Sequence, residues 1–265
     1  MILATSSYPE IFSAIEAEEE KIAYAIGKEE KKAIKTFEKS SKRYSLYYTK
    51  EYTVPSSRNR YLIWYFMPDA DVVKPAFYWG APLLLDEDNG KRIVIALSSM
   101  RAEGKGGSFN VDALQVYNGH FLSRYRERAG LPGEYTTAQV IATLMGNNAS
   151  CMVQLDMEKM NPNYEKYKDA AVWQLTNGFS FGKQLVCESP SGKTFVVFEH
   201  KTYVSSDMLK QQQVDAAIPH EIVEMMMLRA SLKYSDVIVG NPFDSHHGKL
   251  NSVEIRDSVI RNLNY

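Results

Sequence analysis

The sequence predicts an α+β fold, and three observations lead to this prediction. Residues 9–42 carry an apolar stripe at helical spacing. Residues 44–99 change to short β-branched and aromatic runs, which are typical of strands. From residue 108 onward, the patterns predict a strand, two helices, three strands and a helical tail. The 265 residues suffice for one large domain or two small ones.

The N-terminal helix is predicted from a set of apolar residues whose spacing places them on one face of a helix. Gly27 lies within this stripe, and we expect it to separate two helical pieces. The runs at 18–21 and 29–32 place Glu and Lys three residues apart, so we interpret them as a solvated face. The stripe consists of Ile11, Ile15, Ile22, Ile26, Ala33 and Phe37.

An antiparallel sheet is predicted next, with strands at 44–52, 61–66, 77–85 and 92–97. Asn89 and Gly90 form the signal of a tight hairpin between the last two. The loop 104–107, Gly-Lys-Gly-Gly, is the best boundary in the chain. It would divide an N-terminal unit, 1–104, from a second unit, 105–265, although one continuous domain stays open as an alternative.

The second unit begins with a predicted strand at 109–117 and a helix that starts near His120. Thr136 and Gln139 fit a capping box that opens the next helix. A polar connection at 151–168 leads to strands at 171–175, 183–188 and 194–204. Helices near 206–214, 219–232 and 253–263 close the chain. The unit is therefore β-α-α-β-β-β with a helical C-terminal tail.

Composition excludes several classes of protein. Lys and Arg number 31 against 32 Asp and Glu, so any contact with nucleic acid must be a local patch. Cys151 and Cys187 lack the CxxC spacing of a metal or redox site and are expected to be reduced. No apolar run has the length of a signal peptide core or a membrane span. We expect a soluble cytoplasmic protein without a membrane partner.

The candidate site starts from the spacing of His120, Arg124 and Arg128, which recur every four residues. On a helix these side chains stand one above another on a single face. Three stacked cationic side chains repel one another unless an anion lies opposite them. That anion is either a carboxylate of the protein itself or a phosphate or carboxylate of a partner.

This column could cleave RNA without a metal or cofactor. A histidine at a helix start tends to be neutral and can act as a base, here toward the 2′-hydroxyl. The guanidinium groups of Arg124 and Arg128 could hold the phosphate and stabilise its developing charge. In the structural alternative, the two arginines pair with Glu127, Glu134 or carboxylates of the N-terminal unit, and His120 caps or packs.

Residues 108–205 resemble the small toxin domains of the RelE/barnase-like ribonuclease group. The resemblance rests on His120, Arg124, Glu127 and Arg128 in the first helix, on Thr136, Val140 and Leu144 in the second, and on Thr202-Tyr203-Val204-Ser205 in the last strand. It implies RNA-directed activity. The long N-terminal unit and the helical tail depart from the small free-standing toxins of that group.

The toxin-like layout implies that the last strand faces the histidine helix. Strict alternation would place His200, Thr202 and Val204 on one face, and Lys201 and Tyr203 on the other. We choose His200 and Thr202 as the pair that lines the cleft. The predicted catalytic site is therefore His120, Arg124, Arg128, His200 and Thr202.

Other motifs are explained by local structure. His220 and Glu224 have metal-ligand spacing, with His246 or His247 as a further ligand, but Pro219 and Glu221 are signals of a helix start. Residues 191–194, Ser-Gly-Lys-Thr, lack the first glycine and the helix of a P-loop. We therefore predict no metal site, no cofactor and no nucleotide-binding loop.

Two functional hypotheses follow. The first is a metal-independent RNA-binding or RNA-cleaving toxin-like domain of a bacterial or mobile-element protein, which requires an open, positively charged groove. The second is a non-catalytic regulatory protein that uses the same fold to bind a protein partner, with its arginines held by internal acids. The sequence does not determine the partner or the oligomeric state.

Overall fold

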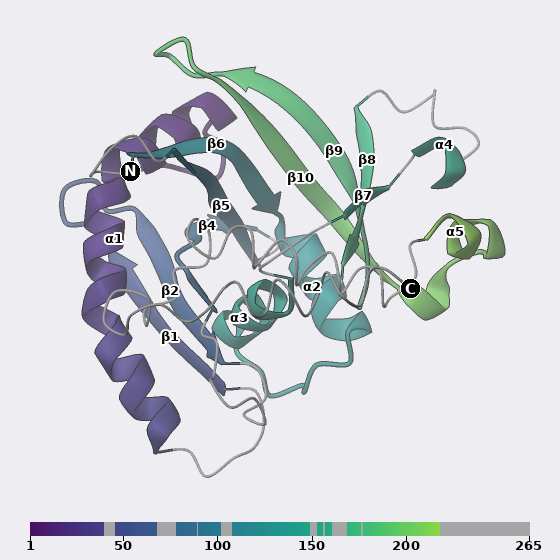
Figure 1. The fold of residues 1–265 in the computed structure, drawn as a ribbon, viewed down its shortest axis with the longest axis horizontal. Coiled ribbons are helices and arrows are strands. Elements are labelled where there is room, and N and C mark those ends of the chain that lie inside the picture. The colour runs from purple at the N-terminus through teal and green to yellow at the C-terminus, as the bar shows by residue number, and fades with distance from the viewer. Residues whose placement is uncertain are drawn as a thin grey trace, which may run out of the picture.

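A computed structural model of the chain describes residues 1–39, 46–67, 78–88, 90–101, 108–148, 153–155, 157–160, 169–175 and 177–217 (Figure 1). The loop at 104–107, Asn89, Cys151, the predicted helices at 219–232 and 253–263, and the histidines after residue 217 lie outside the described residues.

The described helices and strands follow the predicted order in part, since the single strand predicted at 77–85 is two strands, β3 and β4. The helices are α1 (Tyr8–Glu38), α2 (Gly119–Arg128), α3 (Thr137–Asn148), α4 (Met157–Met160) and α5 (Gln211–Ala216), with a short 3-10 helix at Ser206–Met208. The strands are β1 (Leu46–Thr53), β2 (Arg60–Met67), β3 (Tyr78–Gly80), β4 (Leu83–Glu87), β5 (Gly90–Arg101), β6 (Ser108–Tyr117), β7 (Val153–Leu155), β8 (Ala170–Leu175), β9 (Gly178–Glu188) and β10 (Thr194–Ser205). The predicted α+β class is confirmed.

The strands form one ten-stranded sheet in the order β1-β2-β4-β5-β6-β10-β9-β8-β7, with β3 paired to β2. All neighbours are antiparallel except β6 and β10, which run parallel. The long connection between these two strands contains α2, α3, β7, α4, β8 and β9. Strands from both sides of the expected boundary at 104–107 therefore belong to the same sheet, joined through β5 and β6.

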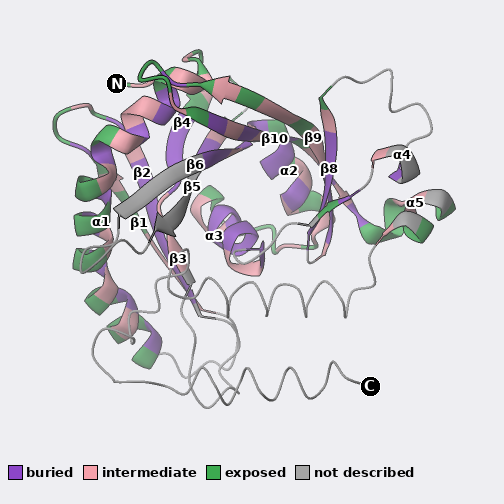
Figure 2. Ribbon diagram, turned by 45° about the horizontal axis from the view of Figure 1, so that its top comes forward, coloured by how far each residue is buried: buried purple, intermediate pink, exposed green. Residues whose placement is uncertain are grey.

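The two faces of the sheet are covered by different helices (Figures 1 and 2). In β2, Tyr61, Ile63 and Tyr65 belong to the clusters that pack against α1, whereas Leu62 and Trp64 pack with α2 and α3. This is the period of two that a strand imposes on its side chains. Because both faces are buried, the strand is a continuous apolar run.

Helix α1 is continuous through Gly27, so the expectation that this glycine separates two helical pieces is wrong. Ile22 and Ala25 on one side of Gly27, and Ala33 and Phe37 on the other, are all buried against the sheet. Packing on both sides outweighs the low helix propensity of one glycine.

A buried polar network fastens α1 to β2. The Glu18 carboxylate, 5% exposed, accepts hydrogen bonds from Tyr61 Oη at 2.7 Å and from Asn59 Nδ2 at 3.1 Å. Asn59 Oδ1 in turn accepts from the Ile2 backbone N–H at 2.7 Å. The network therefore joins the N-terminal segment, α1 and the β1–β2 turn.

The polar connection at 151–168 contains two elements that the sequence pattern did not predict. Residues Val153–Leu155 form the edge strand β7 beside β8, and Met157–Met160 form α4. Strand β9 also begins at Gly178, five positions before the predicted start at 183. No helix in the described ranges is long and apolar enough to cross a membrane.

Candidate functional site

Helix α2 carries the predicted histidine and arginines, and its boundaries have local causes. Asn118 caps the start, because its side-chain oxygen accepts from the Phe121 N–H at 2.8 Å. Phe121, Leu122 and Tyr125 form the buried side against β10 and β6. Gly130 follows the helix with a φ of +65°, a conformation that glycine adopts readily.

A carboxylate of the protein itself lies at the start of α2. Glu87 Oε2 accepts from the Gly119 N–H at 3.2 Å, and Glu87 Oε1 pairs with Arg92 at 2.6 Å. Arg92 also donates to the Ala4 carbonyl oxygen at 2.9 Å. A negative charge at a helix N-terminus is stabilising, so Glu87 holds the first turn of α2 from inside the protein.

The outer side of α2 carries His120 and Arg124. His120 is exposed, and Arg124 pairs with the exposed carboxylate of Glu127 at 2.8 Å. Glu127 is one of the internal partners that the structural alternative named. Because this pair is exposed, its contribution to stability is about 1 kcal/mol at most.

Arg128 and Arg126 contact backbone carbonyls instead of carboxylates. Arg128 Nη1 donates to the Tyr203 carbonyl oxygen at 2.6 Å, and Arg126 Nη2 donates to the Tyr135 carbonyl oxygen at 2.9 Å. These contacts position the end of α2 over β10 and fix the loop before α3. Neither arginine forms an ion pair with a carboxylate of a described residue.

His200 is sealed under α2 and does not meet His120. Its ring is 0% exposed and stacks on Tyr117, with 4.2 Å between ring centroids. Trp173 and Phe121 complete the surrounding aromatic shell at 4.5 Å and 5.9 Å. Phe121 belongs to the buried side of α2, so the helix itself separates His200 from the exposed His120.

The buried histidine has one polar neighbour in the described part of the chain. His200 Nδ1 lies 2.6 Å from Ser180 Oγ, whereas Nε2 has no hydrogen-bond partner there. Burial lowers the pKa of His200 to about 3, because the aromatic shell cannot solvate a cation. The histidine and serine are chemically a base and a hydroxyl, but substrate cannot reach either, since Ser180 is also fully buried.

Thr202 lies on the opposite face of the sheet from His200, which corrects the predicted alternation. The β9–β10 register shifts between His200 and Thr202, so His200 pairs with Gly182 and Thr202 with Phe181. Burial follows the same shift, because His200 and Tyr203 are buried while Lys201 is exposed. A β-bulge inserts one unpaired residue and reverses the alternation beyond it.

Thr202 therefore shares a face with Phe181, which packs with Met160 of α4, and it faces away from α2. Of the five predicted site residues, the structure brings only His120 and Arg124 together on the outer face of α2, with Arg128 behind them at the helix end.

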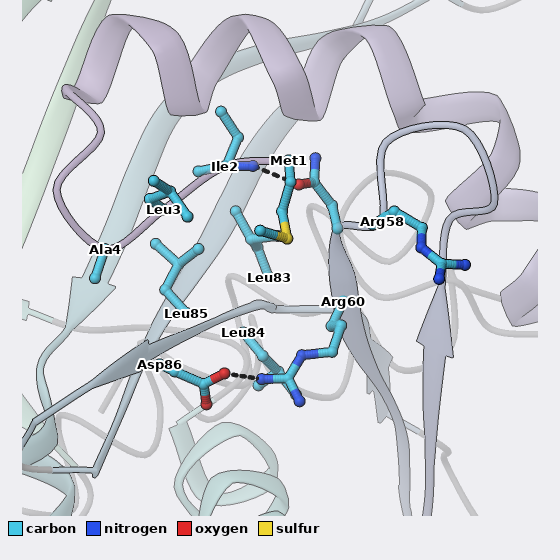
Figure 3. Close-up of a pocket in the computed structure, with 11 residues that line it drawn as sticks. Met1, Ile2, Leu3, Ala4, Arg58, Arg60, Leu83, Leu84, Leu85 and Asp86 are labelled. Carbon is cyan, nitrogen blue, oxygen red and sulfur yellow. Dashed lines mark hydrogen bonds and ion pairs between the residues drawn. The ribbon is translucent and has the colours of Figure 1, made fainter.

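A cavity in the described structure lies away from α2. It has a volume of about 110 Å³ and is bounded by the N-terminal segment 1–4 and by β4 (Figure 3). Drug-sized ligands occupy sites of about 300–1,000 Å³. In the close-up, the guanidinium of Arg58 points away from the cavity, and Arg60 is turned toward Asp86. We assign no ligand to it.

Within the described ranges, no three His, Cys, Asp or Glu side chains gather to hold a metal. Comparison of the chain with protein-family models, curated proteins and solved structures found no match. The resemblance to toxin-like ribonucleases therefore stays a prediction, and the functional argument rests on the geometry of α2.

Sequence reasoning missed the residues that hold α2 in place. Glu87 and Arg92 lie on the β4–β5 hairpin, 32 and 27 positions before Gly119. A single sequence carries no signal that these side chains reach the start of a later helix. The alternation of β4 places Glu87 on the same face as Leu83 and Leu85, which pack with α1, so this pattern does not point to α2 either.

Proposed function

We propose that the chain binds RNA through the outer face of α2, with Arg124 and His120 as the contacting residues. The proposal is carried by the charge of this helix, since Arg124, Arg126 and Arg128 lie within five positions of one another. Only Arg124 has a carboxylate partner in the described structure. A phosphate can replace Glu127 in that pair, because an exposed ion pair is weak and a guanidinium binds phosphate in a bidentate manner.

The chemistry open to this surface is limited to His120. A histidine beside a bound phosphate can take the proton of a 2′-hydroxyl as the 2′-oxygen bonds to phosphorus and the bond from phosphorus to the 5′-oxygen breaks. The 5′-oxygen then takes a proton from water or from the imidazolium, and Arg124 stabilises the charge on the phosphate. His200 and Thr202 are left out of the proposal, since His200 is buried and Thr202 faces the other side of the sheet. Cleavage would therefore depend on His120 and Arg124 alone.

RNA binding is tested by fluorescence anisotropy with a labelled, unstructured single-stranded RNA. We expect Arg124→Ala to weaken binding several-fold and to reduce the slope of log K against log salt by about 0.7, the value for one lost phosphate contact. Lys183→Ala, an exposed lysine on β9, is the matched control and should bind as the wild type does. Unchanged affinity and salt slope in Arg124→Ala would contradict the proposal.

Cleavage is tested separately by induced expression in a bacterial host, with total RNA examined on a gel. If His120 acts as the base, the wild type degrades RNA and slows growth, while His120→Ala does neither. Intact RNA in all strains, together with Arg124-dependent binding in vitro, means that the protein binds RNA without cleaving it.

A second candidate is a non-catalytic protein-binding role. It is favoured by the internal contacts of Arg126 and Arg128, which give both side chains a purpose in the fold. This role predicts that the wild type binds no RNA at low salt and that Arg124→Ala changes neither growth nor RNA integrity.

A further inference from the structure

Helix α1 exposes an aromatic side chain that the fold does not use. Tyr24 is 73% exposed, whereas the apolar residues on the other side of α1, such as Ile22 and Ala25, are buried against the sheet. The outer side of α1 is open to solvent along its length (Figure 2). Tyr24 contributes to none of the core clusters of the described structure.

Three lysines continue the line that Tyr24 begins. Lys28, Lys31 and Lys35 follow it at four, seven and eleven positions, so all four side chains lie on one face of the helix. All three lysines are exposed, and none forms an ion pair with a described residue. We call Tyr24, Lys28, Lys31 and Lys35 the α1 stripe.

Two acidic residues lie in the middle of this region, Glu29 and Glu30. Glu29 is buried and accepts from Lys32 Nζ at 2.8 Å and from Tyr48 Oη at 2.5 Å. The hydrogen bond from Lys32, and then that from Tyr48, lower the pKa of Glu29. The charge of Glu29 is therefore engaged away from the stripe. Glu30 is half-buried, and helical spacing places it off the line of the three lysines. Glu20 and Glu38 lie at the two ends of the stripe.

Gly27 adds no side chain to the helix surface next to Tyr24. It lies three positions after Tyr24, so the two are neighbours on the helix surface. A Cβ at Gly27 would meet no atom within 4 Å, which means that packing does not require glycine there. Glycine is a poor helix former, and its presence at this exposed position has no explanation in the fold.

We propose that the α1 stripe is a second contact surface for single-stranded RNA. Tyr24 stacks on a base, and Lys28, Lys31 and Lys35 contact the phosphates beside it. With 1.5 Å of rise per residue, Lys28, Lys31 and Lys35 span about 10 Å along the helix, so they form one row along which a strand's backbone can run. The inference rests on the proposed function for its ligand class. Its residues are separate, because α1 and α2 cover opposite faces of the sheet (Figure 1).

An anionic membrane surface is the competing partner for lysines beside an aromatic ring. A helix that lies in a membrane interface inserts a whole apolar face. The apolar face of α1 is buried against the sheet, with Ile11, Phe12 and Ala33 fully covered. Tyr24 is the one aromatic residue that the outer side of the described helix presents. Stacking and phosphate contacts with RNA fit this surface better.

The test measures the anisotropy of a labelled single-stranded RNA with the full chain. Tyr24→Ala should weaken binding about 5- to 150-fold, the range found for loss of one stacked base, and Tyr24→Phe should restore it because it keeps the ring. The double variant Lys28→Ala with Lys31→Ala should lower the salt slope by about 1.4, for two lost phosphate contacts. Lys183→Ala is again the control.

The outcomes separate this inference from the proposed function. Loss of binding in the α1 variants with unchanged binding in Arg124→Ala supports the stripe and contradicts the role of α2. Weaker binding in Arg124→Ala, with unchanged binding in the α1 variants, overturns the role of the stripe and leaves the role of α2 in place. Absence of RNA binding in the wild type overturns both. Tyr24-dependent binding to vesicles containing phosphatidylserine, without binding to RNA, would overturn the RNA assignment in favour of a membrane surface.

Discussion

Two histidines that the sequence placed in one site have opposite surroundings in the structure. His120 is exposed on the outer side of α2, and His200 is sealed between that helix and the sheet. Phe121, the residue after His120, forms part of the wall around His200. Residue type and spacing identified both as titratable groups, but burial decides which of them a substrate can reach.

His200 should make the fold sensitive to acid. Its pKa is about 3 in the folded protein and about 6.5 in the unfolded chain. Between these values the unfolded chain binds a proton that the folded protein does not, so stability falls as the pH falls below 6.5. At pH 5, wild type should lose about 2 kcal/mol through this residue.

The measurement is the free energy of unfolding by urea at pH 7 and at pH 5. His200→Phe keeps an aromatic ring in the shell but has no group that titrates there. From pH 7 to pH 5, its free energy of unfolding should fall by about 2 kcal/mol less than that of the wild type. His120→Ala removes a histidine at an exposed position and serves as the control. Equal pH dependence in wild type and His200→Phe would show that His200 is not the source of it.

Two tyrosines of β2 donate similar hydrogen bonds to α1, one to a charged group and one to a neutral group. Tyr61 Oη donates to the buried Glu18 carboxylate at 2.7 Å, and Tyr65 Oη donates to the Ile26 carbonyl oxygen at the same distance. Hydrogen bonds to charged groups contribute about 1.5–3 kcal/mol and those to neutral groups about 0.5–1.5 kcal/mol. In urea denaturation, Tyr61→Phe should therefore be the more destabilising change. Equal losses would mean that the Glu18 charge is not stabilised through Tyr61.

At the scale of elements, periodicity predicted most helices and strands correctly. The apolar stripe of α1 and the Thr136 capping box depend only on residues that are neighbours in sequence. In the structure, Thr136 and Gln139 form the expected reciprocal hydrogen bonds, at 2.9 Å and 3.3 Å. Strand β7 was missed because a three-residue edge strand has too few side chains to show alternation.

The β9–β10 bulge shows why register escaped prediction. Alternation assumes that every residue of β10 pairs with β9, and a single extra residue at Lys201 moves Thr202 to the other face. Gly182, opposite His200, has a structural reason to be glycine. A Cβ there would lie 1.8 Å from the Glu199 carbonyl oxygen. A single sequence reveals this close approach only as an isolated glycine in a strand.

Two helical glycines should respond in opposite ways to alanine. Gly27→Ala meets open space and should stabilise the protein by about 0.5–1 kcal/mol, since alanine is the better helix former. Gly146→Ala would place a Cβ 2.5 Å from the buried Phe66 ring and should destabilise by about 1–3 kcal/mol. Thermal unfolding of both variants checks the pair. A destabilised Gly27→Ala would mean that the glycine has a structural role in α1.

At the scale of the whole molecule, one sheet crosses the boundary that composition suggested. Strand β5 pairs with β6 along its length, and β6 pairs with β10. Two independent domains would need separate cores. Here, the cluster under α2 and α3 takes Trp64 and Phe66 from the N-terminal part and Tyr203 from the last strand. We therefore expect the described fold to unfold as one unit.

The three tryptophans allow this expectation to be measured. Trp64 and Trp79 lie in β2 and β3, and Trp173 lies in β8 near the far edge of the sheet. Trp173→Phe leaves fluorescence only in the N-terminal strands, and Trp64→Phe with Trp79→Phe leaves it only in β8. Unfolding of each variant in urea is followed by tryptophan fluorescence and by far-UV circular dichroism. The two signals should change together in a single transition. If the fluorescence of Trp173 in β8 changed at a different urea concentration from the circular dichroism, the chain would contain two domains.

Local sequence patterns were enough to predict the α+β class, most of the described helices and strands, and the spacing of His120, Arg124 and Arg128 on α2, because each depends on residues close together in the chain. Contacts between distant segments account for the remaining features. They placed Glu87 at the start of α2, buried His200 beneath Phe121, and turned Thr202 to the opposite face. These outcomes depend on strand register and on contacts between distant segments, and neither has a periodic signature in one sequence.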